Sequence, residues 1–228
     1  MKLLSVDTSS DVCSVAILEN AKLIKELHKT DSKTHSENLM PLIDSLLKEF
    51  SFTLDDINAI ACSIGPGSFT GIRIGIASCK AMAEVKNIPL IGVTSLETLA
   101  YLEDNSNKNI ASIIDAKNHQ AYAGIFSPNH LLLEDYMADD ISTIVSRLAK
   151  YTPLTFVGNG SIIYKELLQS EFPQANFSGC FVQSAYALGK CAYSKWKAGQ
   201  TLTPDTLLPL YLRKSQAERM KQNNGTAN

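Results

Sequence analysis

The first half of the chain changes from strand-like to helical hydrophobic patterning. Short apolar or alternating runs at 2–6, 12–18 and 22–27, separated by polar turns, predict three strands in a β-meander. Residues 34–37 read Thr-His-Ser-Glu, which has the spacing of a capping box. Apolar residues then recur at helical spacing, so a helix is expected over 35–50, with an apolar stripe wider than one sheet face requires.

A strand is predicted at 58–63, followed by a glycine turn and a helix over 68–86. A ridge of very small residues runs along this helix at intervals of four: Gly67, Gly71, Gly75, Cys79 and Ala83. Because residues four apart share a helix face, the ridge predicts close approach of another backbone. Packing within the same domain and a seam with a second chain both remain open. So does anion binding at the turn, although the lysine of a Walker loop is missing.

The remaining sequence repeats the order of the first part. A strand at 90–93, a short helix from 95 and a polar linker at 103–109 complete the first half. Strands then follow at 110–114, 120–126, 130–134 and 154–157. Helices are expected at 139–150, from the turn at 158–161 to about 170, and at 184–198. This duplicated unit is typical of the α/β ribonuclease-H-like double lobe of actin, Hsp70 and sugar kinases, the ASKHA fold.

We therefore expect an N-terminal lobe over 1–105 and a C-terminal lobe over 106–228. Residues 204–213 read as an extended segment that returns to dock on the protein, and 223–228 as a disordered tail. Basic residues at 213–214 and 219–221 form a small patch, which is either a solvated helix or a contact for nucleic acid.

In this fold, the turn after the first strand of each lobe faces the cleft. Asp7, Thr8 and Ser9 offer a carboxylate for magnesium and hydroxyls for phosphate, and Gly158 and Gly160 offer bare backbone for an adenosine. These five residues are the candidates for a vestigial nucleotide site; the alternative is that both turns are purely structural. The four histidines show no metal-binding spacing, and no catalytic triad appears.

Composition limits the functional classes further. The 228 residues carry a formal charge of −2 and are 45% hydrophobic, so nothing marks a general nucleic-acid binder. Five cysteines without CxxC spacing suit buried thiols in a reducing compartment. The chain shows no signal peptide and no long apolar span, so a cytoplasmic protein without a membrane segment is expected.

Several motifs resemble one family across nearly the whole chain. They are Val6–Ser9, Cys13–Ala16, His35–Ile43, Gly65–Gly75, Gly92–Leu96 and Tyr211–Arg213. Together they resemble the TsaB (formerly YeaZ) family of tRNA threonylcarbamoyladenosine biosynthesis. The resemblance implies work with TsaD and the ATPase TsaE. TsaD transfers a threonylcarbamoyl group from threonylcarbamoyl-AMP to the adenosine 3′ of the anticodon, in tRNAs reading codons that begin with adenine.

The resemblance also implies that this chain is not itself the enzyme. TsaD carries a His-x-x-x-His metal pair after the strand that follows the glycine helix, and the matching positions here are Ser95 and Leu99. Neither residue replaces a metal-binding imidazole. We therefore expect a non-catalytic scaffold without metal or catalytic residues. No cofactor is expected, and weak nucleotide binding in the cleft or at the complex interface is left open.

In the family, the helices that correspond to 35–50 and 68–86 form a four-helix bundle with TsaD or, when the protein is alone, in a homodimer. tRNA is then reached only through the complex. The expected interface residues are His35, Leu39, Met40, Leu42, Ile43, Leu46, Leu47, Gly67, Ser68, Phe69, Thr70, Gly71, Arg73, Ile74 and Gly75.

Two other functions compete with the scaffold. One is an enzyme acting alone, either an ATP-dependent phosphotransferase, favoured by the paired glycine turns, or an M22-type metallopeptidase homologue, which the missing metal pair disfavours. The other is a direct tRNA binder, which depends only on the C-terminal basic residues.

Overall fold

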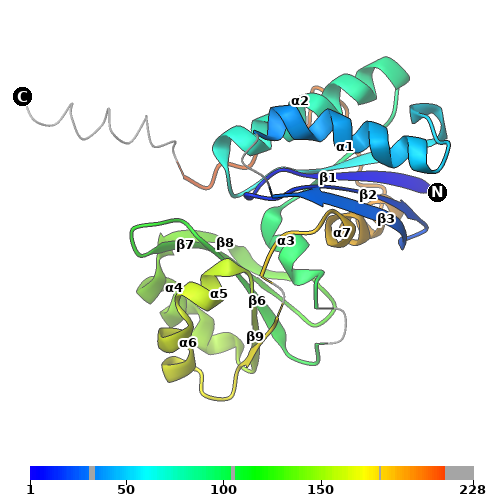
Figure 1. The fold of residues 1–228 in the computed structure, drawn as a ribbon. Coiled ribbons are helices and arrows are strands. Elements are labelled where there is room, and N and C mark those ends of the chain that lie inside the picture. The colour runs from blue at the N-terminus through cyan, green and yellow to red at the C-terminus, as the bar shows by residue number, and fades with distance from the viewer. Residues whose placement is uncertain (31–33, 104–105, 180, 214–228) are drawn as a thin grey trace, which may run out of the picture.

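The computed structural model describes residues 1–30, 34–103, 106–179 and 181–213. It consists of two stacked lobes, each built on a five-stranded mixed sheet (Figure 1). The disordered tail and most of the basic patch predicted from the sequence lie outside the described residues.

The first sheet has the order β3-β2-β1-β4-β5. Its strands are β1 (Lys2–Asp7), β2 (Cys13–Glu19), β3 (Lys22–Lys29), β4 (Ala59–Ser63) and β5 (Leu90–Val93). The meander β1–β2–β3 is antiparallel, whereas β4 and β5 run parallel to β1. The tight turn between β2 and β3 places Asn20 and Ala21 at positive φ.

The second sheet repeats this order as β8-β7-β6-β9-β10. Its strands are β6 (Asn109–Asp115), β7 (Gln120–Phe126), β8 (Leu132–Asp140), β9 (Leu154–Val157) and β10 (Asn176–Phe177). Pairing is again antiparallel through β6, β7 and β8, and parallel for β9 and β10. The predicted duplication and the ASKHA architecture are therefore confirmed.

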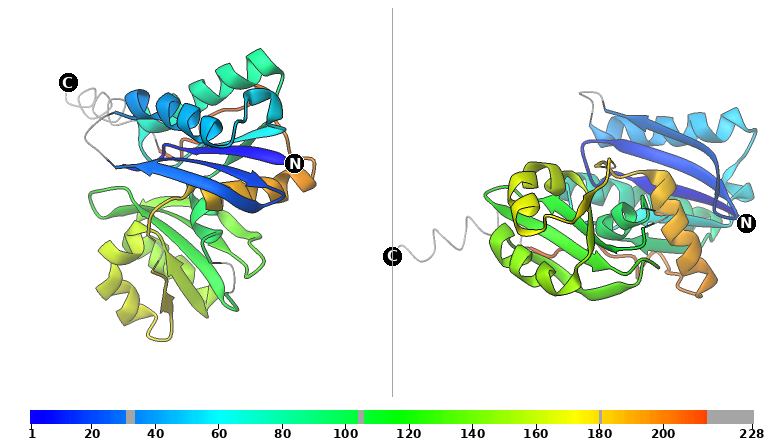
Figure 2. Two further views of the ribbon diagram at one scale, coloured as in Figure 1. Left: turned by 45° about the vertical axis from the view of Figure 1, so that its right-hand side comes forward. Right: turned by 90° about the horizontal axis from the view of Figure 1, so that it is seen from below.

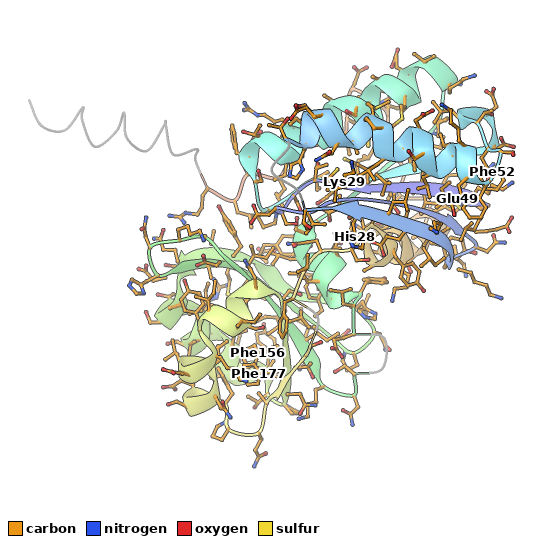
Figure 3. The ribbon with its side chains drawn as sticks, viewed as in Figure 1. His28, Lys29, Glu49, Phe52, Phe156 and Phe177 are labelled. Carbon is orange, nitrogen blue, oxygen red and sulfur yellow. The ribbon has the colours of Figure 1, made fainter. Side chains whose placement is uncertain are left out.

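Helices cover the outer faces of both sheets. The outer helices are α1 (His35–Glu49) and α2 (Phe69–Lys86) on the first sheet, and α4 (Ile141–Leu148), α5 (Asn159–Ile163) and α6 (Lys165–Glu171) on the second. Short 3₁₀ turns occur at η1 (Leu54–Asp56) and η2 (Ala149–Tyr151). In the second lobe, the rings of Phe156 and Phe177, labelled in Figure 3, lie with their centroids 5.2 Å apart in the core.

Two helices are exchanged between the lobes. α3 (Ser95–Ala100) follows the first sheet but packs on β6 and β7. α7 (Ala185–Lys197) follows the second sheet but packs on the first (Figures 1 and 2). The sequence assigned the helix at 184–198 to the second lobe, and that packing is wrong. Its buried residues Ala185, Leu188 and Ala192 fill the inner face of the first sheet.

Two further details differ from the predicted pattern. β8 extends to Asp140, beyond the expected end at residue 134, because its pairing with β7 continues as far as Gln120. β10 is only two residues long, too short to give an alternating pattern. No helix among the described residues has the length and apolar content needed to span a membrane.

The segment after α7 docks on the protein, as predicted, and the lobe it returns to is the first. Leu202 pairs with Leu90, and Leu207 is fully buried in the first core. The Leu210 amide donates to the Ile64 carbonyl oxygen over 2.8 Å. We call residues 202–213 the C-terminal strap. Its last residue, Arg213, donates to the Gln120 side chain of the second lobe, so the strap touches both lobes.

Candidate partner interface

The glycine ridge of α2 faces the turn after β1, within its own lobe. A β-carbon on Gly71 would lie 2.0 Å from the Thr8 carbonyl oxygen, and one on Gly67 would lie 2.1 Å from the Ser9 carbonyl oxygen. At Gly75 the nearest atom is the Thr8 hydroxyl oxygen, at 2.4 Å. These distances are far below normal contact, so the small residues exist because the chain's own turn occupies the space.

This result corrects the sequence interpretation of the ridge as a seam for a foreign helix. The ridge advances along α2 on its buried side, where Cys79 and Ala83 also lie. Successive steps of four rotate by about 40° around a helix of 3.6 residues per turn, which keeps all the helical members of the ridge on the sheet-facing half. Packing within the domain, which the spacing left open, is the correct alternative.

The apolar stripe of α1 is also buried within its own lobe. Five of the predicted interface residues are buried in the first core: Leu39, Leu42, Ile43, Leu46 and Leu47. Their prediction as partner contacts is wrong, because α1 packs against β2, β3 and α2 at once. A wide stripe is what a helix in a corner between a sheet and another helix needs.

Other predicted interface residues do reach the surface. Met40 is 48% exposed, and Gly67, Ser68, Thr70 and Arg73 are exposed as well. His35, Phe69 and Ile74 are half-buried. None of these positions has been tested as a partner contact, and they stay a prediction.

The accessible side of α2 carries a second row of small and apolar residues. We call it the outer stripe, and it consists of Thr70, Ile74, Ala77, Ala81 and Val85. Spacings of four, three, four and four place these residues on one helix face. Val85 is 80% exposed. Ala77, Ala81 and Val85 are not among the interface residues predicted from the sequence. Their helical spacing is visible there, but the glycines of the buried ridge dominate the pattern.

His35 ties the start of α1 to the same turn that α2 contacts. Its Nε2 lies 2.8 Å from the Ser10 carbonyl oxygen. Since a carbonyl oxygen only accepts, Nε2 carries the proton and donates. On α2, Ser68 caps the first turn by accepting from the Gly71 amide, and its own amide donates to the Ser9 carbonyl oxygen over 2.7 Å. The turn after β1 therefore holds the N-terminal ends of both outer helices.

Phe69, Arg73 and Tyr211 form a stacked group where the strap meets the first turn of α2. The rings of Phe69 and Tyr211 lie with centroids 4.8 Å apart. The Arg73 guanidinium carbon lies 3.9 Å from the Phe69 ring centroid, and its Nε donates to the Tyr211 hydroxyl over 2.8 Å. The sequence indicated that the strap would dock, but nothing in the pattern indicated that Tyr211 would meet Arg73.

The candidate nucleotide site of the first lobe is closed by its own hydrogen bonds. The Thr8 hydroxyl donates to the Gly71 carbonyl oxygen over 2.8 Å. The Ser9 hydroxyl and amide both donate to Asp7 Oδ1, at 2.7 and 2.8 Å. Both hydroxyls expected to bind phosphate are therefore committed to holding the turn.

Asp7 itself is only 1% exposed, and its Oδ2 has no hydrogen-bond partner among the described residues. Burial raises the pKa of Asp7 from 3.8 to about 6, against the opposing effects of the Ser9 hydrogen bonds and the charge of His35. An orphaned carboxylate oxygen is the one feature of a magnesium site that the turn retains.

The matching turn of the second lobe is closed as well. Gly158 and Gly160 are buried, and β-carbons on them would lie 2.4 Å from the Ile113 carbonyl oxygen and 2.5 Å from an Ile113 methyl group, respectively. β6 therefore fills the space beside these glycines where a side chain would lie, and an adenosine site at this turn stays a prediction. Taken together, the five candidate residues do not fit a magnesium nucleotide.

The positions that match the TsaD metal pair are equally enclosed. Ser95 and Leu99 are fully buried, and the Ser95 hydroxyl lies 3.1 Å from that of Ser63. Among the described residues, no group of three or more His, Cys, Asp or Glu side chains is placed to hold a metal ion.

Comparisons with known proteins agree with one another. The sequence model of the family described as TsaD: tRNA N6-adenosine threonylcarbamoyltransferase matches residues 24–219. The Bacillus subtilis tRNA threonylcarbamoyladenosine biosynthesis protein TsaB is 31% identical over 222 residues, which cover 96% of each chain. The Escherichia coli TsaB is 35% identical over 124 residues, which cover 54% of this chain and 53% of that protein.

Solved structures give the same result. A Pseudomonas aeruginosa protein described as similar to peptidase YEAZ has a TM-score of 0.80 and 27% identity, covering 93% of this chain and 99% of that one. YeaZ from Pseudomonas aeruginosa has a TM-score of 0.77 and 26% identity, with 92% and 99% covered. The Clostridium difficile activator of 2-hydroxyisocaproyl-CoA dehydratase, at 12% identity and a TM-score of 0.55, shares the fold alone. The match along nearly the full length of both sequence and structure shows that this chain belongs to the TsaB (YeaZ) family of tRNA threonylcarbamoyladenosine biosynthesis proteins.

Proposed function

We propose that this protein is a non-catalytic partner of TsaD in the synthesis of threonylcarbamoyladenosine on tRNA. TsaD transfers the threonylcarbamoyl group from threonylcarbamoyl-AMP to the adenosine 3′ of the anticodon, in tRNAs reading codons that begin with adenine. This chain holds TsaD in its working arrangement, TsaE joins the assembly, and tRNA is reached only through the complex. The site of action is the cytoplasm.

The observation that carries the proposal is the outer face of the first lobe. α1 and α2 form the outermost layer there (Figure 1), and α2 presents the outer stripe with Met40 exposed on α1. Exposed alanines, a valine and a methionine, together with the half-buried Ile74, signal an interface. Alanines at Ala77 and Ala81 allow a partner helix to approach α2 closely.

The contact surface in this proposal is therefore narrower than the sequence implied. It uses Met40, Ser68, Thr70, Arg73 and Ile74 from the original set and adds Ala77, Ala81 and Val85. Two copies of the same face can pair in a homodimer when TsaD is absent. A helix from TsaD displaces the second copy in the functional complex.

Catalysis is left to TsaD in this proposal. Ser95 and Leu99, at the positions of the TsaD metal pair, are buried and chemically unsuited to bind a metal. The turns expected to cradle a nucleotide are closed by Thr8, Ser9 and Ile113. These observations support a scaffold over a phosphotransferase or a metallopeptidase acting alone.

The proposal is tested by measuring particle size and tRNA modification together. The chain alone, TsaD alone and the mixture are compared by light scattering, and each is then supplied with TsaE, threonylcarbamoyl-AMP and unmodified tRNA. We expect a mixed complex that modifies tRNA, with no modification by this chain alone. Turnover by the lone chain, or failure to form a complex, would overturn the scaffold.

The enzymatic alternative has its own measurement. Calorimetry of the isolated chain with ATP and magnesium is expected to show no tight binding, because Thr8 and Ser9 are already hydrogen-bonded. Tight binding with turnover would favour the phosphotransferase.

A further inference from the structure

The guanidinium of Arg73 is held in one orientation before any partner binds. The guanidinium carbon lies over Phe69, 3.9 Å from the centroid of that ring, and 5.7 Å from the centroid of the Tyr211 ring. The Tyr211 hydroxyl accepts from Nε over 2.8 Å. A long flexible side chain normally loses rotamer freedom on binding, and this stacking has already removed much of it.

The terminal nitrogens of Arg73 remain available. Arg73 is exposed to solvent, and among the described residues it forms no ion pair with a carboxylate. With Nε occupied, the two Nη groups still present a planar fork of N–H donors. Such a fork matches the two oxygens of one carboxylate.

Arg73 also stands beside the outer stripe, three residues after Thr70 and four before Ala77, all on the accessible side of α2. These neighbours are uncharged. If a partner covers this face, an unpaired guanidinium would be taken out of water, which is strongly unfavourable. The surface therefore requires a partner that brings one negative charge to this point.

We propose that Arg73, held by Phe69 and Tyr211, is a preorganised receptor for a single carboxylate of the partner subunit. This inference rests on the proposed function, because it assigns the recognition chemistry of the same face. The occupant is an Asp or Glu side chain on the helix that packs along the outer stripe. Its two oxygens accept from the two Nη groups while the surrounding apolar side chains exclude water.

A carboxylate suits the site better than a phosphate. A phosphate group carries close to two charges and three acceptor oxygens, and its sites gather several donors. Here one guanidinium supplies the fork, and the flanking stripe positions Thr70, Ile74 and Ala77 add no second cation.

The test measures the affinity of the full-length chain for purified TsaD, with each variant first checked for an unchanged unfolding temperature. Arg73→Met should weaken binding by at least about tenfold, since it leaves the partner's carboxylate buried without a donor. Arg73→Lys should recover little, because an ammonium group cannot offer the fork. Tyr211→Phe keeps the ring but releases Nε, and it should cause a smaller loss. Lys197→Met removes an equal charge from an exposed position on α7, away from the outer stripe, and serves as the matched control.

Charge reversal identifies the occupant. Arg73→Glu should abolish binding, and one Asp→Arg or Glu→Arg substitution in TsaD should restore it. Unchanged affinity of Arg73→Met, with wild type binding normally, would overturn the receptor but leave the scaffold standing. Failure of the wild-type chain to bind TsaD would overturn both. Binding of inorganic phosphate by the lone chain that Arg73→Met abolishes would show a phosphate site and overturn the carboxylate assignment.

Discussion

The carbonyl oxygen of Thr8 would lie only 2.0 Å from a β-carbon built on Gly71. The Thr8 hydroxyl also donates to the Gly71 carbonyl oxygen over 2.8 Å. This pair fixes the start of α2 on the end of β1. It also explains a glycine that costs an isolated helix about 1 kcal/mol relative to alanine.

Gly71→Ala should therefore destabilise the protein, despite the higher helix propensity of alanine. The added carbon meets backbone rather than a movable side chain, so we expect a loss of about 2–3 kcal/mol or more in the free energy of unfolding. Chemical denaturation measures this loss. Ala77→Gly, on the exposed side of the same helix, is the control and should cost only about 1 kcal/mol. A more stable Gly71→Ala variant would contradict the close approach.

Asp7→Asn should change how stability depends on pH. The folded state holds the proton up to a pKa of about 6, whereas the unfolded chain releases it near 3.8. The free energy of unfolding therefore falls progressively as the pH rises from about 4 to 6, because Asp7 must ionise in a buried site. Above about pH 6 this loss is complete. A shift of this size corresponds to roughly 3 kcal/mol.

The asparagine can still accept the Ser9 hydrogen bonds, so the variant should be the more stable protein at pH 8, with a smaller difference at pH 4.5. Urea denaturation of both proteins across this range measures the difference. Parallel pH profiles would show that Asp7 is not held in the neutral form.

Ala77→Arg and Ala81→Arg should disrupt the proposed complex without harming the fold. Both alanines are exposed and face away from the first sheet, so a long charged side chain obstructs only a partner. We expect loss of co-purification with TsaD and a proportional loss of tRNA modification in the reconstituted assay. Ala149→Arg, exposed on the second lobe, is the matched control. Normal complexes with both outer-stripe variants would place the interface elsewhere.

Leu207 and Leu208 separate the two roles of the C-terminal strap. Leu207 is fully buried against the first core, whereas its neighbour is 64% exposed. Leu207→Ala should cost about 2–5 kcal/mol of unfolding free energy, and Leu208→Ala less than about 0.5 kcal/mol. Thermal unfolding of the two variants measures both effects. Equal destabilisation would mean that the strap is not anchored through Leu207.

The sequence by itself determined the family, the duplication and the order of the strands and helices, apart from the two-residue β10. These features are local or periodic: the meander, the capping box at Thr34 and the turn at Gly65 each leave a signature within a few residues. The tertiary structure alone decided which faces are free. A row of glycines at Gly67, Gly71 and Gly75 predicts a close neighbour equally well whether it belongs to the same chain or another. Only the folded path of β1 shows that Thr8 and Ser9 are that neighbour, and only the exchange of α3 and α7 fills the inner face of each sheet and leaves α1 and α2 outermost. The physical reason is that periodicity records how closely atoms must approach, whereas the identity of the approaching atoms depends on contacts between residues far apart in the chain.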